Sequence, residues 1–326
     1  MECRHTFGKP KRLPANYSDF VKFYNFVLNK LNKTALSEEM FLSRTTLWRK
    51  FSPFFHYLVL PEDSFFLLRN NSSSRVEKHW VLGIDGKWLR RFGVVMIYRN
   101  VTSGTNLYWR FHTSESYEAV ESDFNNLLPL IKNSPPSCVI SDWKGAIVSS
   151  VRQYLPTLPH QRCLSHVKRE ACRLLPLRSP FLATRMLRTT AQKLKIIENK
   201  KEKKLWIKEV NDWIKEYEFL LKEKTIGIST KKKWWYTHGN LRRGVRLLTR
   251  NYENMFVYLN YFFLPKTNNS LEGLNSQIKT KLSNHRGMKI DQQTIFISWF
   301  FTFNRVETRS DLKQLWARLK NKIFAV

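Results

Sequence analysis

The stretch HWVLGIDGKWL (residues 79–89) decides how the surrounding chain is interpreted. Its apolar run ends at Ile84, and an acid and a glycine follow as Asp85 and Gly86. A short apolar run closed in this way predicts a buried β-strand. Asp85 is therefore expected at the end of a buried strand.

The segments that follow this strand continue the pattern. Residues 92–101 and 107–113 alternate in hydrophobicity and predict two more strands, joined by the turn TSGTN. The next predicted elements are a helix at 116–133, a strand at 138–142, a helix at 146–155 and a last strand at 160–167. This order, β-β-β-α-β-α-β, predicts an α/β fold in which helices cover a mixed sheet.

A second acid stands at the end of a second buried strand. Asp142 closes CVISD (138–142), and Gly145 follows closely. Adjacent strand ends bring two such carboxylates close together, where they repel each other and favour protonation of one. A bound Mg²⁺ removes that cost because a hard divalent cation prefers carboxylate oxygen. Either aspartate taken alone could be an ordinary cap or turn residue.

A third acid lies far downstream, in TNNSLEGLNSQIK (267–279). The amides and the hydroxyl at 268–270 predict a helix cap, which places Glu272 in the first turn of that helix. Glu272 could be a simple surface charge. With the two strand-end aspartates it could instead complete a set of three carboxylates that holds two metal ions about 4 Å apart for phosphoryl transfer.

The composition indicates a polyanionic partner. The 326 residues include 56 Lys and Arg against 26 Asp and Glu, a net charge of +30, and 42% of the residues are hydrophobic. A globular chain this basic is typical of nucleic-acid binding, with an anionic membrane surface as the second candidate. The four cysteines are not spaced as a disulfide framework, and we find no signal peptide or transmembrane stretch. We therefore expect a soluble protein of a reducing cytoplasm.

The first 75 residues predict a helical DNA-binding region. Residues 17–31 have helical apolar spacing, and Ser37 is expected to start a second helix. Ser43 can cap a third helix that carries Arg44, Arg49 and Lys50. Two short helices, the second rich in Arg, Thr and Lys, resemble a helix-turn-helix, and an ordinary helical hairpin is an equal alternative.

Four segments together resemble the catalytic core of DDE transposases: VLGIDGKWL (81–89), CVISDWKGAI (138–147), HQRCLSHVKRE (160–170) and TNNSLEGLNSQIKTKLSNHRGM (267–288). The resemblance is to bacterial insertion-sequence transposases related to Mutator-like elements, and it covers roughly residues 78–300. It implies a ribonuclease H-like core with an α-helical insertion before the glutamate-bearing helix. It also implies that Asp85, Asp142 and Glu272 are the catalytic, metal-binding residues, with two Mg²⁺ or Mn²⁺ ions.

The resemblance and the hydrophobic pattern together divide the chain. We expect the DNA-binding region at 1–75, the first part of the core at 76–175, an insertion at 176–262 and the rest of the core at 263–326. The insertion has apolar positions near a period of 3.6, so it should be helical, with a break near 199–203 and no strand. Residues 1–10 look like the tail of a zinc ribbon in which only Cys3 remains. The start codon could be misplaced, the copy truncated, or the module absent from this member.

Other residues of these segments have expected supporting roles. Cys163 and His166 match a Cys-x2-His motif of the family, so they either brace the active-site strand or place His166 near the scissile phosphate. The segment at 234–246 could stack bases and hold phosphates, or form an aromatic helix core, through Trp234, Trp235, Arg242, Arg243 and Arg246. Asn275, Lys279 and Arg286 on and after the glutamate helix are expected to contact DNA, and a solvated surface is an equal alternative.

The sequence therefore predicts a DDE transposase. Such an enzyme cuts at transposon ends by hydrolysis and joins the 3′-hydroxyl to target DNA in a second metal-dependent transesterification. Its expected partners are the terminal repeats, target DNA and further copies of itself assembled on DNA, and its expected location is the nucleoid of a prokaryotic cytoplasm. The alternatives are a truncated or domesticated DNA-binding protein and a structure-specific nuclease of the same fold, such as a junction resolvase. The large insertion and the Cys-x2-His motif disfavour the nuclease.

Overall fold

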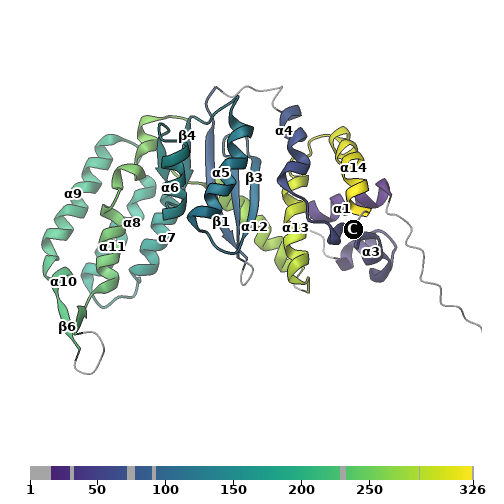
Figure 1. Ribbon diagram of the computed structural model, residues 1–326. Coiled ribbons are helices and arrows are strands. Elements are labelled where there is room, and N and C mark those ends of the chain that lie inside the picture. Colours follow the sequence, from purple (N-terminus) through teal and green to yellow (C-terminus); the bar gives the residue numbers. More distant parts are fainter. Residues whose placement is uncertain are drawn as a thin grey trace, which may run out of the picture. The chain divides into compact units, whose positions relative to one another are not determined.

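The computed structural model describes residues 16–29, 33–71, 78–89, 93–227, 233–285 and 287–324. The chain divides into two compact units (Figure 1). One unit is Glu77–Leu274, and the other joins Met1–Val76 to Asn275–Val326. Cys3 and the zinc-ribbon remnant at 1–10 lie outside the described residues, and so does Arg286. None of the helices within the described ranges is long and apolar enough to cross a membrane.

The unit that joins the two ends of the chain is helical. Its helices are α1 (Tyr17–Leu28), α2 (Lys33–Glu39), α3 (Arg44–Phe51), α4 (Phe65–Asn71), α13 (Ile290–Phe303) and α14 (Arg309–Phe324), with 3-10 turns η1 (Phe54–His56) and η2 (Pro61–Ser64). The predicted apolar face of the first helix is confirmed, because Phe20 and Phe23 are fully buried. Phe23 stacks on Phe54 at 4.7 Å between ring centroids and meets Trp299 edge-on. Aromatic burial therefore joins α1 to α13.

Two predictions about the N-terminal helices had opposite outcomes. Ser43 caps α3, since its Oγ accepts the backbone N–H of Thr46 at 3.1 Å. The prediction that Ser37 starts α2 is wrong, because the helix begins at Lys33 and Ser37 lies in its last turn. There the Ser37 hydroxyl donates back to the carbonyl of Thr34, a local bond that lets serine sit inside a helix.

The other unit contains a mixed sheet, which confirms the predicted order of elements. Within the described residues its strands are β1 (Val81–Trp88), β2 (Val94–Asn100), β3 (Thr105–His112), β4 (Cys138–Ser141) and β5 (His160–Arg162). The spatial order is β3-β2-β1-β4-β5, antiparallel from β3 to β1 and parallel from β1 to β5. The last strand is shorter than predicted: it ends at Arg162, and α7 (Leu164–Leu174) begins two residues later.

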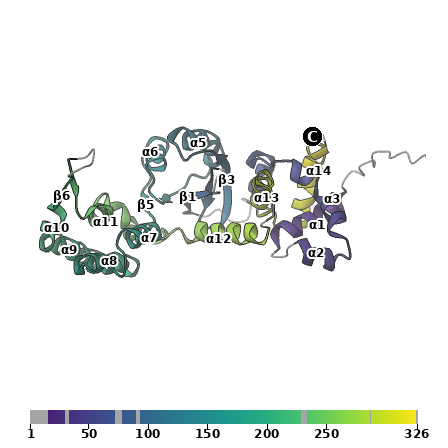
Figure 2. The ribbon, with the colours of Figure 1, turned by 90° about the horizontal axis from the view of Figure 1, so that it is seen from below.

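Helices cover both faces of this sheet. The crossovers α5 (Tyr117–Ile131) and α6 (Gly145–Tyr154) lie on one face, and α7 and the start of α12 (Asn269–Asn284) lie on the other (Figure 2). Burial on both faces explains why Val81, Leu82 and Ile84 of β1 form an unbroken apolar run. Such a run cannot alternate, because no side of the strand faces water.

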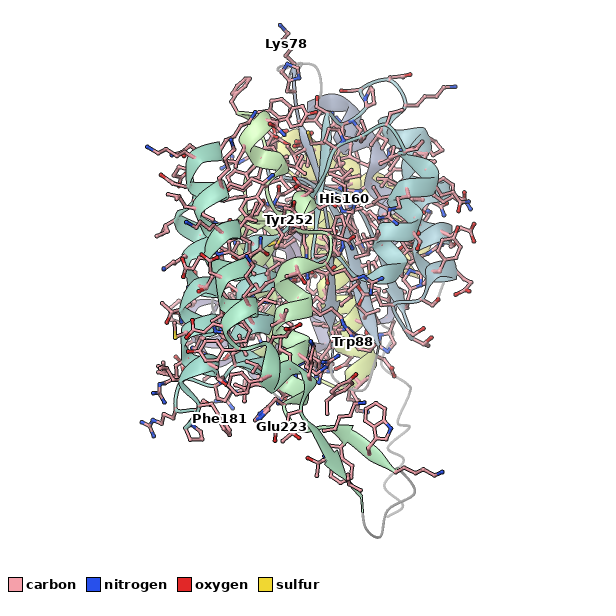
Figure 3. All side chains as sticks on the ribbon, turned by 90° about the vertical axis from the view of Figure 1, so that its left-hand side faces the viewer. Lys78, Trp88, His160, Phe181, Glu223 and Tyr252 are labelled. Carbon is pink, nitrogen blue, oxygen red and sulfur yellow. The ribbon has the colours of Figure 1, made fainter. Side chains whose placement is uncertain are left out.

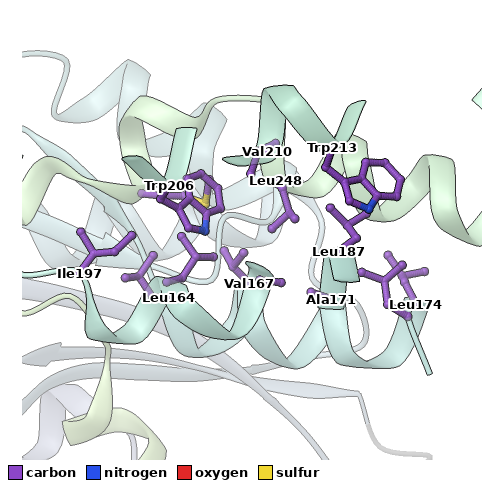
Figure 4. Close-up of a cluster of buried hydrophobic side chains, with 14 of the residues drawn as sticks. Leu164, Val167, Ala171, Leu174, Leu187, Ile197, Trp206, Val210, Trp213 and Leu248 are labelled. Carbon is purple, nitrogen blue, oxygen red and sulfur yellow. The ribbon is translucent and has the colours of Figure 1, made fainter. Parts of the chain in front are cut away.

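A helical lobe separates β5 from α12 in the sequence. It contains α7, α8 (Leu182–Lys193), η4 (Leu194–Ile196), α9 (Lys200–Glu216), α10 (Glu218–Lys222), α11 (Gly239–Thr249), η5 (Tyr252–Met255) and η6 (Val257–Asn260). The lobe has a hydrophobic core of its own (Figure 4). Trp206 and Trp213 are buried there, and their indole N–H groups donate to the carbonyls of Thr190 and Ala183. The predicted break near 199–203 is confirmed: Asn199 caps α9.

Residues 176–262 add no strand to the five-stranded sheet within the described residues, as predicted, but the prediction that this segment contains no strand at all is wrong. Strands β6 (Lys224–Ile226) and β7 (Trp234–Tyr236) form a separate antiparallel pair, and within the described residues neither joins the five-stranded sheet. Figure 3 shows this hairpin projecting beyond the helices near Glu223. Three residues are too few to reveal a period of two. The two strands of the hairpin also contact each other through side chains: the Lys224 ammonium lies 4.2 Å from the centre of the Trp234 ring.

Candidate metal centre

Asp85 and Asp142 come from neighbouring parallel strands. In the register of β1 and β4, Ile84 pairs with Ser141, so the next residue along each strand is an aspartate. Both carboxylates are largely buried, with side chains only 5% exposed. The sheet therefore brings the two strand-end acids together, as the sequence predicts.

His166 joins these two acids to the third. One ligand atom each from Asp85, Asp142 and His166 lie within 4.8 Å of one another, and so do those of Cys163, His166 and Glu272. His166 belongs to both groups, because it lies in the first turn of α7 on the face of the sheet that α12 also covers. We call the three acids and His166 the acid cluster. The prediction that residues 160–167 form one strand is thus wrong for His166, which lies on a helix.

Glu272 is held in position by the start of α12. The backbone N–H of Asn268 donates to Cys163 Sγ at 3.3 Å, and Arg99 Nε of β2 donates to Ser270 Oγ at 2.7 Å. Gly83 of β1 leaves room for the first turn of α12, because an added β-carbon at this glycine would lie 3.1 Å from Leu271 Cδ1. Side chains two apart on a strand share a face, so Asp85 points to the same side as the hollow at Gly83. The first turn of α12 therefore lies on the face to which Asp85 points.

Burial and repulsion alter the protonation of this cluster. Burial, and next the nearby charge of Asp142, raise the pKa of Asp85 to about 7. Burial lowers the pKa of His166, so the neutral imidazole is favoured. His166 Nε2 lies 4.0 Å from Asp85 Oδ1, but with these two shifts the contact is not a firm ion pair near neutral pH. A neutral imidazole is the form that binds metal.

Cations of the protein already contact two of the acids. Lys144 Nζ lies 3.4 Å from Asp142 Oδ2 and also binds the buried carboxylate of Glu115. Arg169 donates to Glu272 Oε1 at 3.0 Å. Sequence reasoning missed Glu115 and Lys144. The only available signal was their charge, since Glu115 precedes a helix cap and Lys144 follows Asp142 by two residues.

The turn after β4, directly beyond Asp142, contains a residue in a strained conformation. Trp143, the next residue, has φ of 72°, a left-handed value that is unfavourable for a bulky side chain. Its N–H donates to Ser141 Oγ at 3.2 Å, and that oxygen lies 2.8 Å from His160 Nε2. Burial lowers the pKa of His160 to about 3, so this histidine stays neutral and acts as a hydrogen-bonding partner of the turn. Such strain is often found at functional sites.

The donors of the acid cluster fit a divalent cation. Two buried carboxylate groups repel each other, and a metal between them would remove that cost. His166 Nδ1 is buried and has no hydrogen-bond partner among the described residues. The set of two oxygens and one nitrogen also suits ions softer than Mg²⁺, such as Mn²⁺ or Zn²⁺. Cys163 Sγ accepts the Asn268 N–H, and burial raises its pKa, so Cys163 fits the bracing role better than that of a ligand.

The described residues that are expected to bind DNA differ in their exposure and contacts. Exposed ones are Arg44 and Arg49 on α3, Trp234 and Trp235 on β7, Arg243 and Arg246 on α11, and Lys279 on α12. Two others have structural partners. Lys50 pairs with Asp19 at 2.9 Å, and the Arg242 guanidinium lies 3.5 Å from the centre of the Tyr236 ring while it donates to the Leu221 carbonyl. Asn275 is half-buried on α12.

Comparison with known proteins adds no family to these observations. No family model matches the chain, and no curated protein matches it. The fold and the acid cluster therefore define this protein at the level that their geometry supports: an α/β protein with a candidate metal centre at the ends of two parallel strands.

Proposed function

We propose that this protein is a DDE transposase with a ribonuclease H-like core. The observation that carries the proposal is the acid cluster itself. Asp85 and Asp142 lie at adjacent strand ends, and both groups of potential ligands share His166. Glu272, which is 103 residues from its ion-pair partner Arg169, completes the second group. The element order β-β-β-α-β-α-β supports the same conclusion, since it is the order that the resemblance implies.

The residues of the cluster have distinct roles under this proposal. Asp85, Asp142 and Glu272 hold two divalent ions, which supply Lewis-acid charge to a scissile phosphodiester and to the attacking water or 3′-hydroxyl. His166 would offer its one neutral imidazole nitrogen to one of these ions. Cys163 braces the start of α12, through the backbone N–H of Asn268. Arg169 and Lys144 lie beside the acids, where they can contact DNA phosphates once metal has taken the carboxylates.

The charge of the chain supports DNA as the substrate. A net charge of +30 is far above what solubility requires. If about 6–10 phosphates are neutralised, DNA affinity should fall by about 10³–10⁵ between 50 and 200 mM salt. A DNA affinity that does not change with salt concentration would show that this charge does not contribute to DNA binding.

The experiment that tests the proposal compares binding with chemistry. A Mg²⁺- or Mn²⁺-dependent cleavage and strand-transfer assay on the cognate element ends is run beside a mobility-shift assay. Asp85→Asn, Asp142→Asn and Glu272→Gln should each abolish cleavage and joining but leave binding intact or slightly tighter, because each removes a charge that repels phosphate. Glu118→Gln, at an exposed site on α5, is the control and should behave as wild type. If all three variants cleave like wild type, the proposal fails.

One observation favours a second candidate, a DNA-binding protein without catalysis. Arg169 and Lys144 already neutralise Glu272 and Asp142, so the fold can hold these acids without metal. In that case wild type binds DNA but cleaves with neither ion. Arg169→Ala separates the candidates: in a metal-binding site it removes a competitor of the ion, so Mn²⁺ affinity should rise. Arg173→Ala, whose partner is Glu170, is the matched control. A pure binder should show no Mn²⁺ binding in either variant.

A further inference from the structure

A cleft of about 520 Å³ lies beside the turn that carries Asp142. Its walls come from α6, β5, α7 and α11, and Trp143 lines it. This volume is in the range of small-ligand sites. Five arginines line the cleft: Arg152, Arg162, Arg243, Arg246 and Arg250. We call it the arginine cleft.

The positive charge of the arginine cleft is only partly balanced by the protein. Among the described residues Glu170 is the one carboxylate in its lining, and Arg173 already binds it, with Nε 2.8 Å from Oε2. Among the described residues, none of the five arginines forms an ion pair with a carboxylate. Like charges gathered around a cavity without a full counter-charge favour an anion inside it.

The excess of positive charge is most unfavourable at Arg162, because this residue is buried. Only 9% of this residue is exposed. Its Nη1 donates to the carbonyls of Leu247 and Arg250, at 3.1 and 3.4 Å, at the C-terminal end of α11. Its Nε is buried and has no hydrogen-bond partner within the described part of the chain. Neutral carbonyls orient the guanidinium but do not neutralise it. The charge of Asp142 acts on Arg162 without forming an ion pair among the described residues, so the burial of this cation is only partly offset.

The register of α11 places several of the other charges on the same wall. Arg243, Arg246 and Arg250 are three and four residues apart, a spacing that aligns side chains along one face of a helix. Arg242, one residue earlier, points elsewhere and packs its guanidinium on Tyr236. One face of α11 therefore presents arginines to the cleft, while the neighbouring arginine has a structural task.

We propose that the arginine cleft binds phosphate groups. Arginine suits this ligand because its planar fork of donors matches phosphate oxygens. Two sources could supply the phosphate: the backbone of a DNA strand, or a soluble polyphosphate such as a nucleotide. The DNA source rests on the proposed function, since a strand held at Asp142 would pass Trp143 and enter the cleft.

Direct binding distinguishes the two sources. The probes are inorganic pyrophosphate and ATP, followed by calorimetry, and a fluorescent 12-nucleotide DNA strand, followed by anisotropy, all in EDTA so that the acid cluster holds no metal. If the strand alone binds, DNA is the source. If pyrophosphate and ATP bind as well, the cleft accepts soluble phosphates.

A charge reversal locates the binding. Arg243→Glu with Arg246→Glu should weaken the responsive probe at least about tenfold, because charge-assisted bonds to phosphate are strong. For the DNA strand it should also lower the slope of log affinity against log salt by about 1.4, because each phosphate that an arginine neutralises on a single strand contributes about 0.7. Lys201→Glu with Lys208→Glu, at exposed sites on α9, changes the net charge equally and should have a much smaller effect.

Chemical protection gives an answer even if the reversed variant folds poorly. Wild-type protein is treated with phenylglyoxal, which modifies arginine, and the modified peptides are identified by mass spectrometry. The bound probe should protect Arg243, Arg246 and Arg250 and leave the exposed Arg178 reactive. Equal modification with and without every probe overturns the proposal. This result is independent of the test of catalysis. If the cleft binds no probe, the carboxylate variants still test the proposed function. If the wild type does not cleave DNA, the binding of phosphate in the cleft is still tested.

Discussion

His166 Nε2 lies 4.0 Å from Asp85 Oδ1. Two ligands of one metal ion have this kind of separation, because two bonds of about 2.1 Å allow at most about 4.2 Å between the donor atoms. The imidazole of His166 was expected either to brace a strand or to lie near the phosphate. Its position in both groups of potential ligands adds a third role, as a donor to metal.

The first prediction concerns His166 as a metal donor. His166→Ala should lower Mn²⁺ affinity by at least about 10–100-fold, since loss of even an outer partner of a metal ligand has this effect. Mg²⁺ affinity should fall less, because Mg²⁺ prefers oxygen. Calorimetric titration of both ions measures the difference. If His166 only braces α7, the variant instead loses thermal stability in EDTA and keeps the wild-type ratio of the two affinities.

The second prediction concerns pH and Asp85. The pKa of Asp85 is about 7 in the folded protein against 3.8 as its ordinary value. The folded state therefore holds this proton more tightly, and the contribution of Asp85 to the stability of the metal-free protein falls as pH rises from about 4 to about 7. Asp85→Asn lacks this loss. At pH 8 its free energy of unfolding should exceed that of wild type by up to roughly 4 kcal/mol, because a tenfold difference in proton affinity corresponds to about 1.36 kcal/mol.

Urea unfolding in EDTA at pH 4, 6 and 8 measures this effect. The two proteins should be equally stable at pH 4 and diverge as pH rises. Mn²⁺ at pH 8 should then stabilise wild type and have little effect on Asp85→Asn. A constant difference across the three pH values would contradict the prediction.

The third prediction concerns the contact between β1 and α12. In Gly83→Ala the new β-carbon would lie 2.5 Å from Val101 Cγ2 and 3.1 Å from Leu271 Cδ1. Overpacking of this kind should cost about 1–3 kcal/mol in the free energy of unfolding, and it should displace the turn that holds Glu272. Gly273→Ala is the matched control, because among the described residues nothing beyond its chain neighbours and the backbone of its own helix lies within 4 Å of the added carbon. It should stabilise α12 by about 0.5–1 kcal/mol. Thermal unfolding and Mn²⁺ titration of both variants give the comparison.

The fourth prediction concerns the exposed tryptophans of the hairpin. Trp234 and Trp235 are 47% and 41% exposed, which leaves ring surface for a base to stack on. Replacing either one with alanine should weaken binding of single-stranded DNA by about 1–3 kcal/mol. Ile226→Ala, on the opposite strand and 77% exposed, should have little effect. Equal losses for all three variants would indicate damage to the hairpin rather than stacking.

Sequence reasoning succeeded where burial leaves a strong pattern. The apolar run before Asp85 and the run before Asp142 predict strands that are covered on both faces, and β1 and β4 are such strands. The alternation after Gly93 likewise predicts β2 and β3. The first-turn position of Glu272 followed from helix-capping rules.

The remaining features depend on tertiary contacts that leave little local signal. The strand predicted through His166 ends at Arg162, because Leu164 turns away to bury itself in the core of the helical lobe. The hairpin at Trp234 is three residues deep on each side, which is below the length at which a period can be recognised. Lys144 and Glu115 meet across 29 residues, and nothing in their own neighbourhoods indicates the pair.

The chain enters the helical lobe and leaves it again at neighbouring positions beside the sheet. The N–H of Leu164 donates to the carbonyl of Lys266 at 3.1 Å, and Cys163 Sγ meets the N–H of Asn268 across 105 residues. Since its two ends are already joined by hydrogen bonds, the segment between them can grow or shrink by whole helices, with an entropic cost of only about 0.6 kcal/mol for each doubling of a flexible loop. The count of residues from Asp142 to Glu272 is then free to vary among proteins with this architecture. A fixed interval between those two acids is a poor guide for finding such proteins. Cys163 is a better one, because its sulfur closes the gap, whereas any residue except proline can supply the backbone N–H that it accepts.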